Sequence, residues 1–147
     1  MPDPSSNSAL NDLLILVYRS LLQYTMECWP WSDSGELGEQ QAIDSLAAEQ
    51  QALVARIAEL LDQRGVVIDM GTYPDWSELH YVSLDSLLAR LIDDEQAMLA
   101  AIERLHPALA GDSEGSALAG EIMAAERRHL SKLRDLAGAR AKTPVPA

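Results

Sequence analysis

The chain has 147 residues, with 11 Lys and Arg against 23 Asp and Glu and a net charge of -12. This length suits a single domain with a hydrophobic core of its own. The acidic balance repels phosphate backbones and anionic lipid headgroups, so we expect neither a nucleic-acid partner nor a membrane partner. The one cysteine, Cys28, excludes an intrachain disulfide. The chain opens without a basic secretion signal and has no apolar run of membrane-spanning length, so we expect a cytoplasmic protein.

Apolar residues recur at spacings of three and four in the first half of the chain, which predicts two amphipathic helices. The first covers about 9–29 and ends before Pro30, which disfavours helical geometry in the residue before it. The second covers about 36–63, with acidic residues in its first turn and Gly65 placed to end it. Gln50 interrupts its apolar stripe.

The second half predicts two more helices. The third begins after Ser83, an N-cap residue, and ends near Leu105, before Pro107. Glu95 interrupts its otherwise apolar seam. The fourth follows the turn at 111–115 and ends near Gly138. We therefore expect an all-α domain over 9–138, with a disordered tail at 1–8 and a flexible tail at 139–147.

The connection at 64–83 is long and non-helical, whereas the other two links are short. Short links suit antiparallel neighbours, and an extended segment of this length can return along the whole bundle. It therefore permits a four-helix bundle in which the second and third helices run parallel. A plain up-and-down bundle with a functional loop is the alternative.

Glu126 and His129 form the sharpest chemical motif. A carboxylate and an imidazole three residues apart project from one face of a helix and can bind one ion together. Glu95 adds a carboxylate within an apolar seam, and a buried carboxylate needs a cation, a proton or a hydrogen bond. The motif indicates a metal site, although Glu-x-x-His also occurs by chance in charged helices.

With Glu49, Glu95 and the Glu126-Arg127-Arg128-His129 motif, the chain resembles the ferritin-like superfamily of four-helix bundles, such as rubrerythrin and bacterioferritin, over about residues 9–138. The resemblance implies ferritin-like topology and a carboxylate-rich iron or manganese site used in ferroxidase, peroxidase or oxygenase chemistry. It also implies that Glu95 bridges two metals and that Glu49 is the carboxylate of the second helix.

The chain departs from the family pattern in its first two helices. Ala52 stands where the second helix would place a histidine, and the first helix offers Tyr18, Gln23 or Tyr24, with Glu27 near its end. The full set of six ligands is therefore absent. One ion bound by Glu95, Glu126 and His129 is an alternative to the two-metal centre. A metal-free ion pair between Glu95 and His129 is another.

Two functions follow from these alternatives. The first is a ferritin-like bundle with an incomplete di-metal site, acting as a non-catalytic structural or protein-interaction unit without catalytic residues or a cofactor. The second is an iron- or manganese-binding protein with ferroxidase-like or peroxidase-like oxidoreductase activity, whose metal residues are Glu49, Glu95, Glu126 and His129. The first is our preferred prediction, and whether the chain is an enzyme stays open.

Aromatic residues gather near helix ends and in the long connection, at Trp29, Trp31, Tyr73, Trp76 and Tyr81. In one interpretation they attach the connection to the bundle, and in the other they form a surface for a protein partner. A small bundle with apolar faces readily associates, and we expect a homodimer or a higher homo-oligomer.

Overall fold

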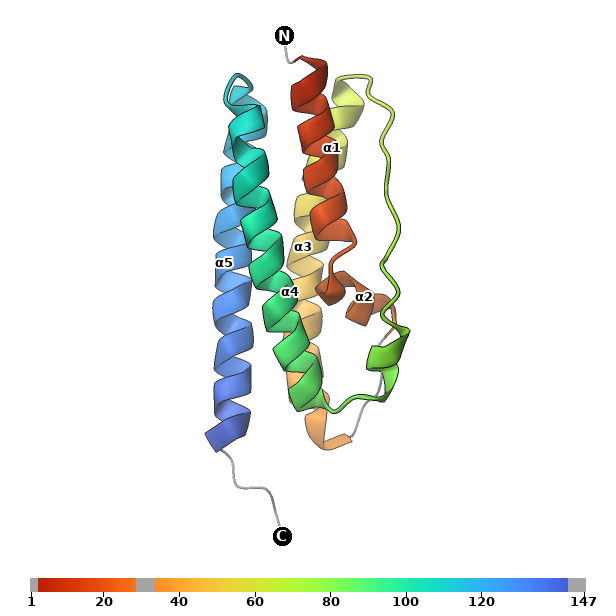
Figure 1. Ribbon diagram of the computed structural model, residues 1–147, viewed down its shortest axis with the longest axis vertical. Coiled ribbons are helices and arrows are strands. Elements are labelled where there is room, and N and C mark those ends of the chain that lie inside the picture. The colour runs from red at the N-terminus through yellow and green to blue at the C-terminus, as the bar shows by residue number, and fades with distance from the viewer. Residues whose placement is uncertain (1–2, 29–33, 143–147) are drawn as a thin grey trace.

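The computed structural model describes residues 3–28 and 34–142, which form α-helices and short 3-10 helices without a strand. Figure 1 shows the long helices lying side by side and a long connection along one side of them. The α-helices are α1 (Pro4–Tyr18), α2 (Leu21–Glu27), α3 (Leu37–Gln63), α4 (Leu84–Leu105) and α5 (Ser113–Lys142). The 3-10 helices are η1 (Ser34–Glu36), η2 (Ser77–Tyr81) and η3 (His106–Leu109). The all-α fold class is confirmed.

Local capping explains where several helices begin. Ser83 is the predicted cap of α4, and its hydroxyl accepts a hydrogen bond from the backbone N–H of Ser86 at 3.2 Å. Asp3 does the same for α1 by accepting the N–H of Ser6 at 2.7 Å, and Pro4 occupies the first helical position. Residues 4–8, which we expected in a disordered tail, therefore belong to α1. At the other end, α5 continues beyond Gly138 to Lys142.

The predicted first helix is broken in two, which corrects our expectation of one helix over 9–29. Its backbone leaves helical geometry at Arg19 and Ser20, and α2 starts afresh at Leu21. The Ser20 hydroxyl caps the new helix, and the carboxylate of Asp94 on α4 accepts the N–H of Leu21 at 3.0 Å. Polar groups from outside the segment thus satisfy the backbone at the break, which periodicity within the segment does not reveal.

The connection between α3 and α4 returns along the length of the bundle, so that α3 and α4 run in the same direction while α1 and α5 run opposite to them (Figure 1). Asn11 on α1 holds its middle by exchanging two 2.9 Å hydrogen bonds with the backbone of Asp69. Gly71 has a φ of 65°, and a Cβ there would lie 2.8 Å from Ile15 Cγ2. Only glycine allows this close approach to α1 without strain.

Aromatic rings attach the second part of the connection. The Tyr24 ring packs edge-on against the rings of Tyr73 and Trp76, with centroids 5.4 and 5.5 Å away. The Arg19 guanidinium lies over the Tyr73 ring at 4.6 Å. These contacts support the structural interpretation for Tyr73 and Trp76. Tyr81, in contrast, is 94% exposed, and Trp29 and Trp31 lie outside the described residues.

The core consists of two separate apolar clusters. One is built from α1, the second half of α3, the end of α4 and the start of α5. The other is built from α2, the first half of α3, η2, the start of α4 and the end of α5. A layer of buried polar side chains lies between the halves of α3, α4 and α5 that form these clusters, and its members are Gln23, Gln50, Glu95, Glu126 and His129.

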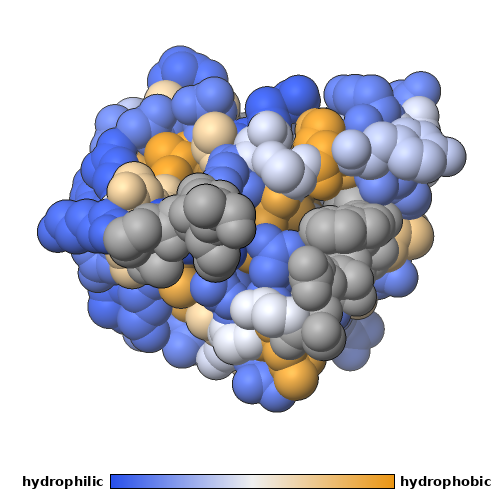
Figure 2. All heavy atoms as spheres, turned by 90° about the horizontal axis from the view of Figure 1, so that it is seen from below, coloured by the Kyte–Doolittle hydropathy of each residue, from blue (hydrophilic) through white to orange (hydrophobic). Residues whose placement is uncertain are grey.

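The lower end of the molecule is mostly hydrophilic where its residues are described. Figure 2 views the molecule from its lower end, where hydrophobic residues form only small areas separated by hydrophilic ones. In the part of the chain that the structure describes, no helix combines the length and hydropathy needed to cross a membrane.

Candidate functional site

The structure brings together three of the four predicted metal residues at the middle of the bundle. Glu95 comes from α4, and Glu126 and His129 come from successive turns of α5. Each of these side chains is fully buried. The i, i+3 spacing therefore places the carboxylate and the imidazole on one inward face, as the sequence predicted.

Gln50 of α3 occupies the space between the two buried carboxyl groups. Its amide nitrogen lies 3.2 Å from Glu95 Oε1 and 3.1 and 2.9 Å from the two oxygens of Glu126. Its amide oxygen accepts hydrogen bonds from Gln23 Nε2 at 3.0 Å and Ser20 Oγ at 3.3 Å. Gln23 also donates to the backbone carbonyl of Ala47 at 2.6 Å. This set fixes the Gln50 amide so that its N–H groups face the carboxyl groups.

His129 bridges a buried and a half-exposed carboxylate. Its Nδ1 lies 3.3 Å from Glu126 Oε2, and its Nε2 lies 2.6 Å from Glu49 Oε2. Burial lowers the pKa of His129, but the two carboxylates outweigh it, so the pKa lies above its ordinary value. The hydrogen bond from His129 in turn lowers the pKa of Glu49. We therefore assign His129 as an imidazolium that donates from both nitrogens.

Glu95 is the group most affected by burial. Burial, and then the adjacent carboxylate of Glu126, raise its pKa far above the usual range of a glutamic acid. As a carboxylate it would leave Oε2 without a hydrogen-bond partner in the described part of the chain. As a protonated acid it donates to Glu126. We therefore assign Glu95 as a protonated acid beside Glu126.

Glu49 occupies a different position from the one that the ferritin-like resemblance implies. Its side chain is 48% exposed, and it reaches the layer only through His129 Nε2. The inward carboxylate position of α3 belongs to Gln50, and the residue three positions later is Leu53 rather than Ala52. One residue along a helix is a rotation of about 100°, so this shift by one changes which side chain faces the site. The interruption of the apolar stripe by Gln50 was the sequence signal for it.

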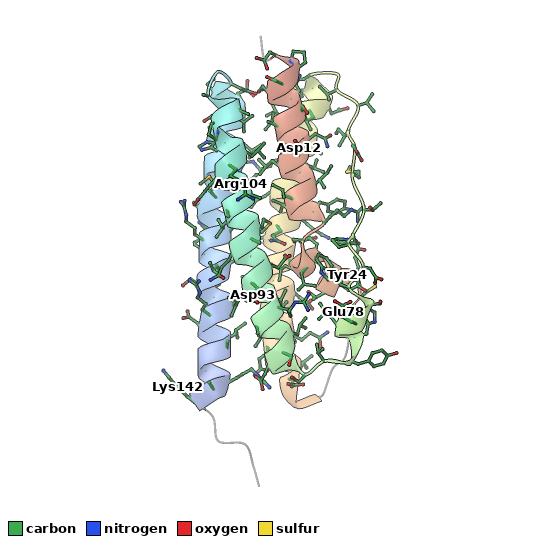
Figure 3. The ribbon with its side chains drawn as sticks, in the orientation of Figure 1. Asp12, Tyr24, Glu78, Asp93, Arg104 and Lys142 are labelled. Atoms are coloured by element: carbon green, nitrogen blue, oxygen red, sulfur yellow. The ribbon has the colours of Figure 1, made fainter. Side chains whose placement is uncertain are left out.

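The tyrosines proposed as ligands from the first helix lie elsewhere. The Tyr24 hydroxyl lies 2.5 Å from His80 Nε2, and Figure 3 shows Tyr24 on the side of the connection, close to Glu78. The Tyr18 ring lies beneath the Arg19 guanidinium, at 4.5 Å. Glu27 is exposed. Gln23 is the member of the predicted set that reaches the layer, which places a neutral amide there instead of a carboxylate.

The side chains present do not fit a two-metal centre. Such a centre needs a carboxylate from the first helix and a Glu-x-x-His pair from the second, and this chain has Gln23, Gln50 and Leu53 in those places. Among residues 3–28 and 34–142, no group of three or more His, Cys, Asp or Glu side chains has an arrangement that would hold a metal ion.

Comparisons with known proteins identify no family for this chain. No family model, no curated protein and no solved structure matches this chain.

Proposed function

We propose that the protein is a ferritin-like four-helix bundle whose metal centre is replaced by a metal-free polar layer, and that it acts as a non-catalytic structural or protein-interaction unit. One observation carries this proposal. The Gln50 amide nitrogen, within 3.2 Å of oxygens from both Glu95 and Glu126, occupies the space that a cation bound by both carboxyl groups would need. An amide N–H donor satisfies the carboxyl oxygens that a metal ion would otherwise coordinate.

The charge balance of the layer supports the same conclusion. Glu95 is held as a neutral acid, the His129 imidazolium lies between the carboxylates of Glu126 and Glu49, and Glu49 reaches water at the edge. A buried network whose members all have partners is stable without an ion. The parallel course of α3 and α4, with the long connection between them, supports ferritin-like topology for the scaffold (Figure 1).

The alternative is a metal-binding oxidoreductase. It is favoured by the buried Oε2 of Glu95, which lacks a hydrogen-bond partner in the described chain when the group is ionised. Glu95, Glu126 and His129 would then hold one iron or manganese ion, with Glu49 beside His129 at the edge. Such an ion would supply ferroxidase-like or peroxidase-like redox chemistry. Binding would require Glu95 to lose its proton and the Gln50 amide to turn or withdraw.

Metal content separates the two functions. Untagged protein purified without chelators is measured by elemental mass spectrometry, before and after aerobic loading with ferrous iron or manganese and desalting. We expect less than about 0.1 metal per chain, with no difference between the wild type, Glu95→Ala and His129→Ala. Near-stoichiometric metal that disappears in both variants would overturn the metal-free proposal. Glu103→Ala, an exposed change on α4, is the matched control.

His129→Ala also tests the structural role of the layer. It leaves the Glu126 carboxylate buried without its cation, so we expect the free energy of unfolding to fall by about 1 to 3 kcal/mol while the helical circular dichroism is retained. Unchanged stability would contradict a structural role for His129.

Gln50→Glu offers a converse test. It replaces the amide donor by a third carboxylate, which creates a four-residue donor set with Glu95, Glu126 and His129. We expect this variant to retain iron or manganese where the wild type does not, and a variant that stays free of metal would show that Gln50 does not decide occupancy.

We also propose which partners the protein has and where it acts. An interaction unit of this kind would act as a homo-oligomer or with another protein in the cytoplasm, and the strongly acidic chain disfavours nucleic acid.

A further inference from the structure

The seam between α3 and α5 carries a shallow hollow directly outside the polar layer. It encloses about 480 Å³ and is lined by four residues from each helix. Its lining residues are Glu49, Ala52, Leu53, Arg56, Glu121, Ala124, Ala125 and Arg128. Further hollows lie along the same seam toward both ends of the bundle, so the face is a long groove.

Charges alternate around the hollow. On α3, Glu49 precedes the small residues and Arg56 follows them, and on α5 the order is Glu121 and then Arg128. Because α3 and α5 are antiparallel, Arg56 pairs with Glu121 across the seam. At the other end of the hollow, Arg128 lines it opposite Glu49, and its positive charge adds to the larger effects of His129 and Lys132 in lowering the pKa of Glu49. The four charges therefore form a square in which each acid has a base on both neighbouring corners.

We propose that a second copy of this chain packs on this face, with a two-fold axis lying in the plane of the interface. A two-fold axis brings identical surfaces together, so the face must be complementary to itself. An alternating square meets this requirement, because rotation about an in-plane axis parallel or perpendicular to the helices places every acid on a base of the other copy. This inference rests on the proposed function as an interaction unit and deepens it, because it names the surface through which a homo-oligomer forms.

The centre of the square suits close packing. Ala52, Ala124 and the edge of Leu53 lie between the charged corners, so helices of two copies can approach without large side chains between them. Arg56 and Glu121 are half exposed in the single chain, at 51% and 54%, and an isolated pair of this kind adds little stability. Covering the face would remove Arg56 and Glu121 from water, together with the exposed side of Glu49. It would also close the edge at which the buried layer reaches solvent through Glu49.

Sedimentation equilibrium of the untagged full chain tests the proposal. We expect a dimer at micromolar concentration. In Glu121→Arg and in Arg128→Glu, we expect the dissociation constant of this dimer to rise at least tenfold, because each change creates two pairs of like charges across the two-fold interface. Glu103→Arg is the matched control, since it also breaks an exposed ion pair, but on the α4 side of α5, and should leave the constant unchanged. A wild-type chain that stays monomeric to about 100 μM, or a Glu103→Arg effect as large as the others, would overturn the proposal.

Two double variants identify the arrangement. Glu121→Arg with Arg128→Glu restores complementarity only if α5 packs on the α5 of the other copy. Arg56→Glu with Glu121→Arg restores it only if α3 packs on that α5, and it also keeps the ion pair within the chain with reversed polarity. Recovery of the dimer in one of the two supports the interface and selects the axis, whereas recovery in neither overturns it. Metal content is unaffected by these surface changes, so failure of this interface is distinguishable from failure of the metal-free proposal.

Discussion

At the scale of single residues, Glu95 makes stability depend on pH. Its pKa is raised in the folded state, so folding takes up a proton and stability falls as the pH rises above about 4.3, the value of an unfolded glutamic acid. Glu95→Gln keeps the shape and supplies an N–H donor without a proton to lose. We expect it to increase the free energy of unfolding at pH 8 by about 1 to 3 kcal/mol and to have a smaller effect at pH 5. Urea unfolding at both pH values measures this, and a loss of stability at pH 8 would contradict a protonated Glu95.

His129 acts in the same direction, but its effect begins at a higher pH than that of Glu95. Its pKa is raised in the folded state, so the stability it contributes is fully present below about pH 6.5 and is lost as the pH rises through the folded value. In a Glu95→Gln background, we expect stability still to fall between pH 6.5 and pH 9, and this fall to be absent after the further change His129→Gln. Urea unfolding midpoints measured across this pH range test whether the imidazole causes the fall in stability. A fall that persists without the imidazole would assign it to another group.

At the scale of helices, a buried ion pair joins three elements at one end of the bundle. Arg64, just after α3, makes two hydrogen bonds of 2.7 and 2.9 Å to Asp112, just before α5, and Ser6 on α1 donates to the same carboxylate at 2.5 Å. The arginine hydrogen bonds lower the pKa of Asp112. Arg64→Leu leaves this carboxylate buried without its cation, so we expect a loss of about 3 to 5 kcal/mol in the free energy of unfolding.

Arg56→Leu is the matched comparison for this variant. It also removes an arginine paired with one carboxylate, but both of its side chains are about half exposed. We expect a loss below about 1 kcal/mol in the monomer. Denaturant unfolding of both variants under the same conditions tests burial as the deciding factor, and equal losses would contradict it.

At the scale of the whole molecule, the long connection is required by the parallel course of α3 and α4 (Figure 1). It must return along α4, whose 22 residues span about 33 Å at roughly 1.5 Å per residue. Replacing residues 66–82 by a six-residue Gly/Ser linker leaves a reach of about 20 Å. We expect this variant to lose its native monomeric packing, seen as misfolding or as exchange of helices between chains in size-exclusion chromatography with light scattering. A native-like chain with the same size and cooperative unfolding would contradict the parallel arrangement.

Much of the helical structure was predictable because its signals are local. The cap at Ser83 and the proline after Leu105 bound α4, and the stripe of apolar residues defines α3. The inward positions of Glu126 and His129 follow from a fixed spacing on one helix, and Glu95 was detectable as a charge within an apolar seam. Each of these features depends on residues within a few turns of one another, where helix geometry is the same in any fold.

The sequence by itself determined an all-α chain, the boundaries of α3 and α4, and the inward faces of α4 and α5. Only the tertiary structure decided that the first helix breaks at Ser20, where Asp94 of another helix satisfies the freed backbone, and that Gln50 faces the layer while Glu49 lies at its edge. Glu49 and Gln50 lie about 100° apart around α3, so the rotation of this helix decides which of them faces the layer, and that rotation depends on packing against other helices. The protonation of Glu95 was likewise undetermined, because it depends on burial and on a carboxylate 31 positions away in the chain, which only folding brings into contact.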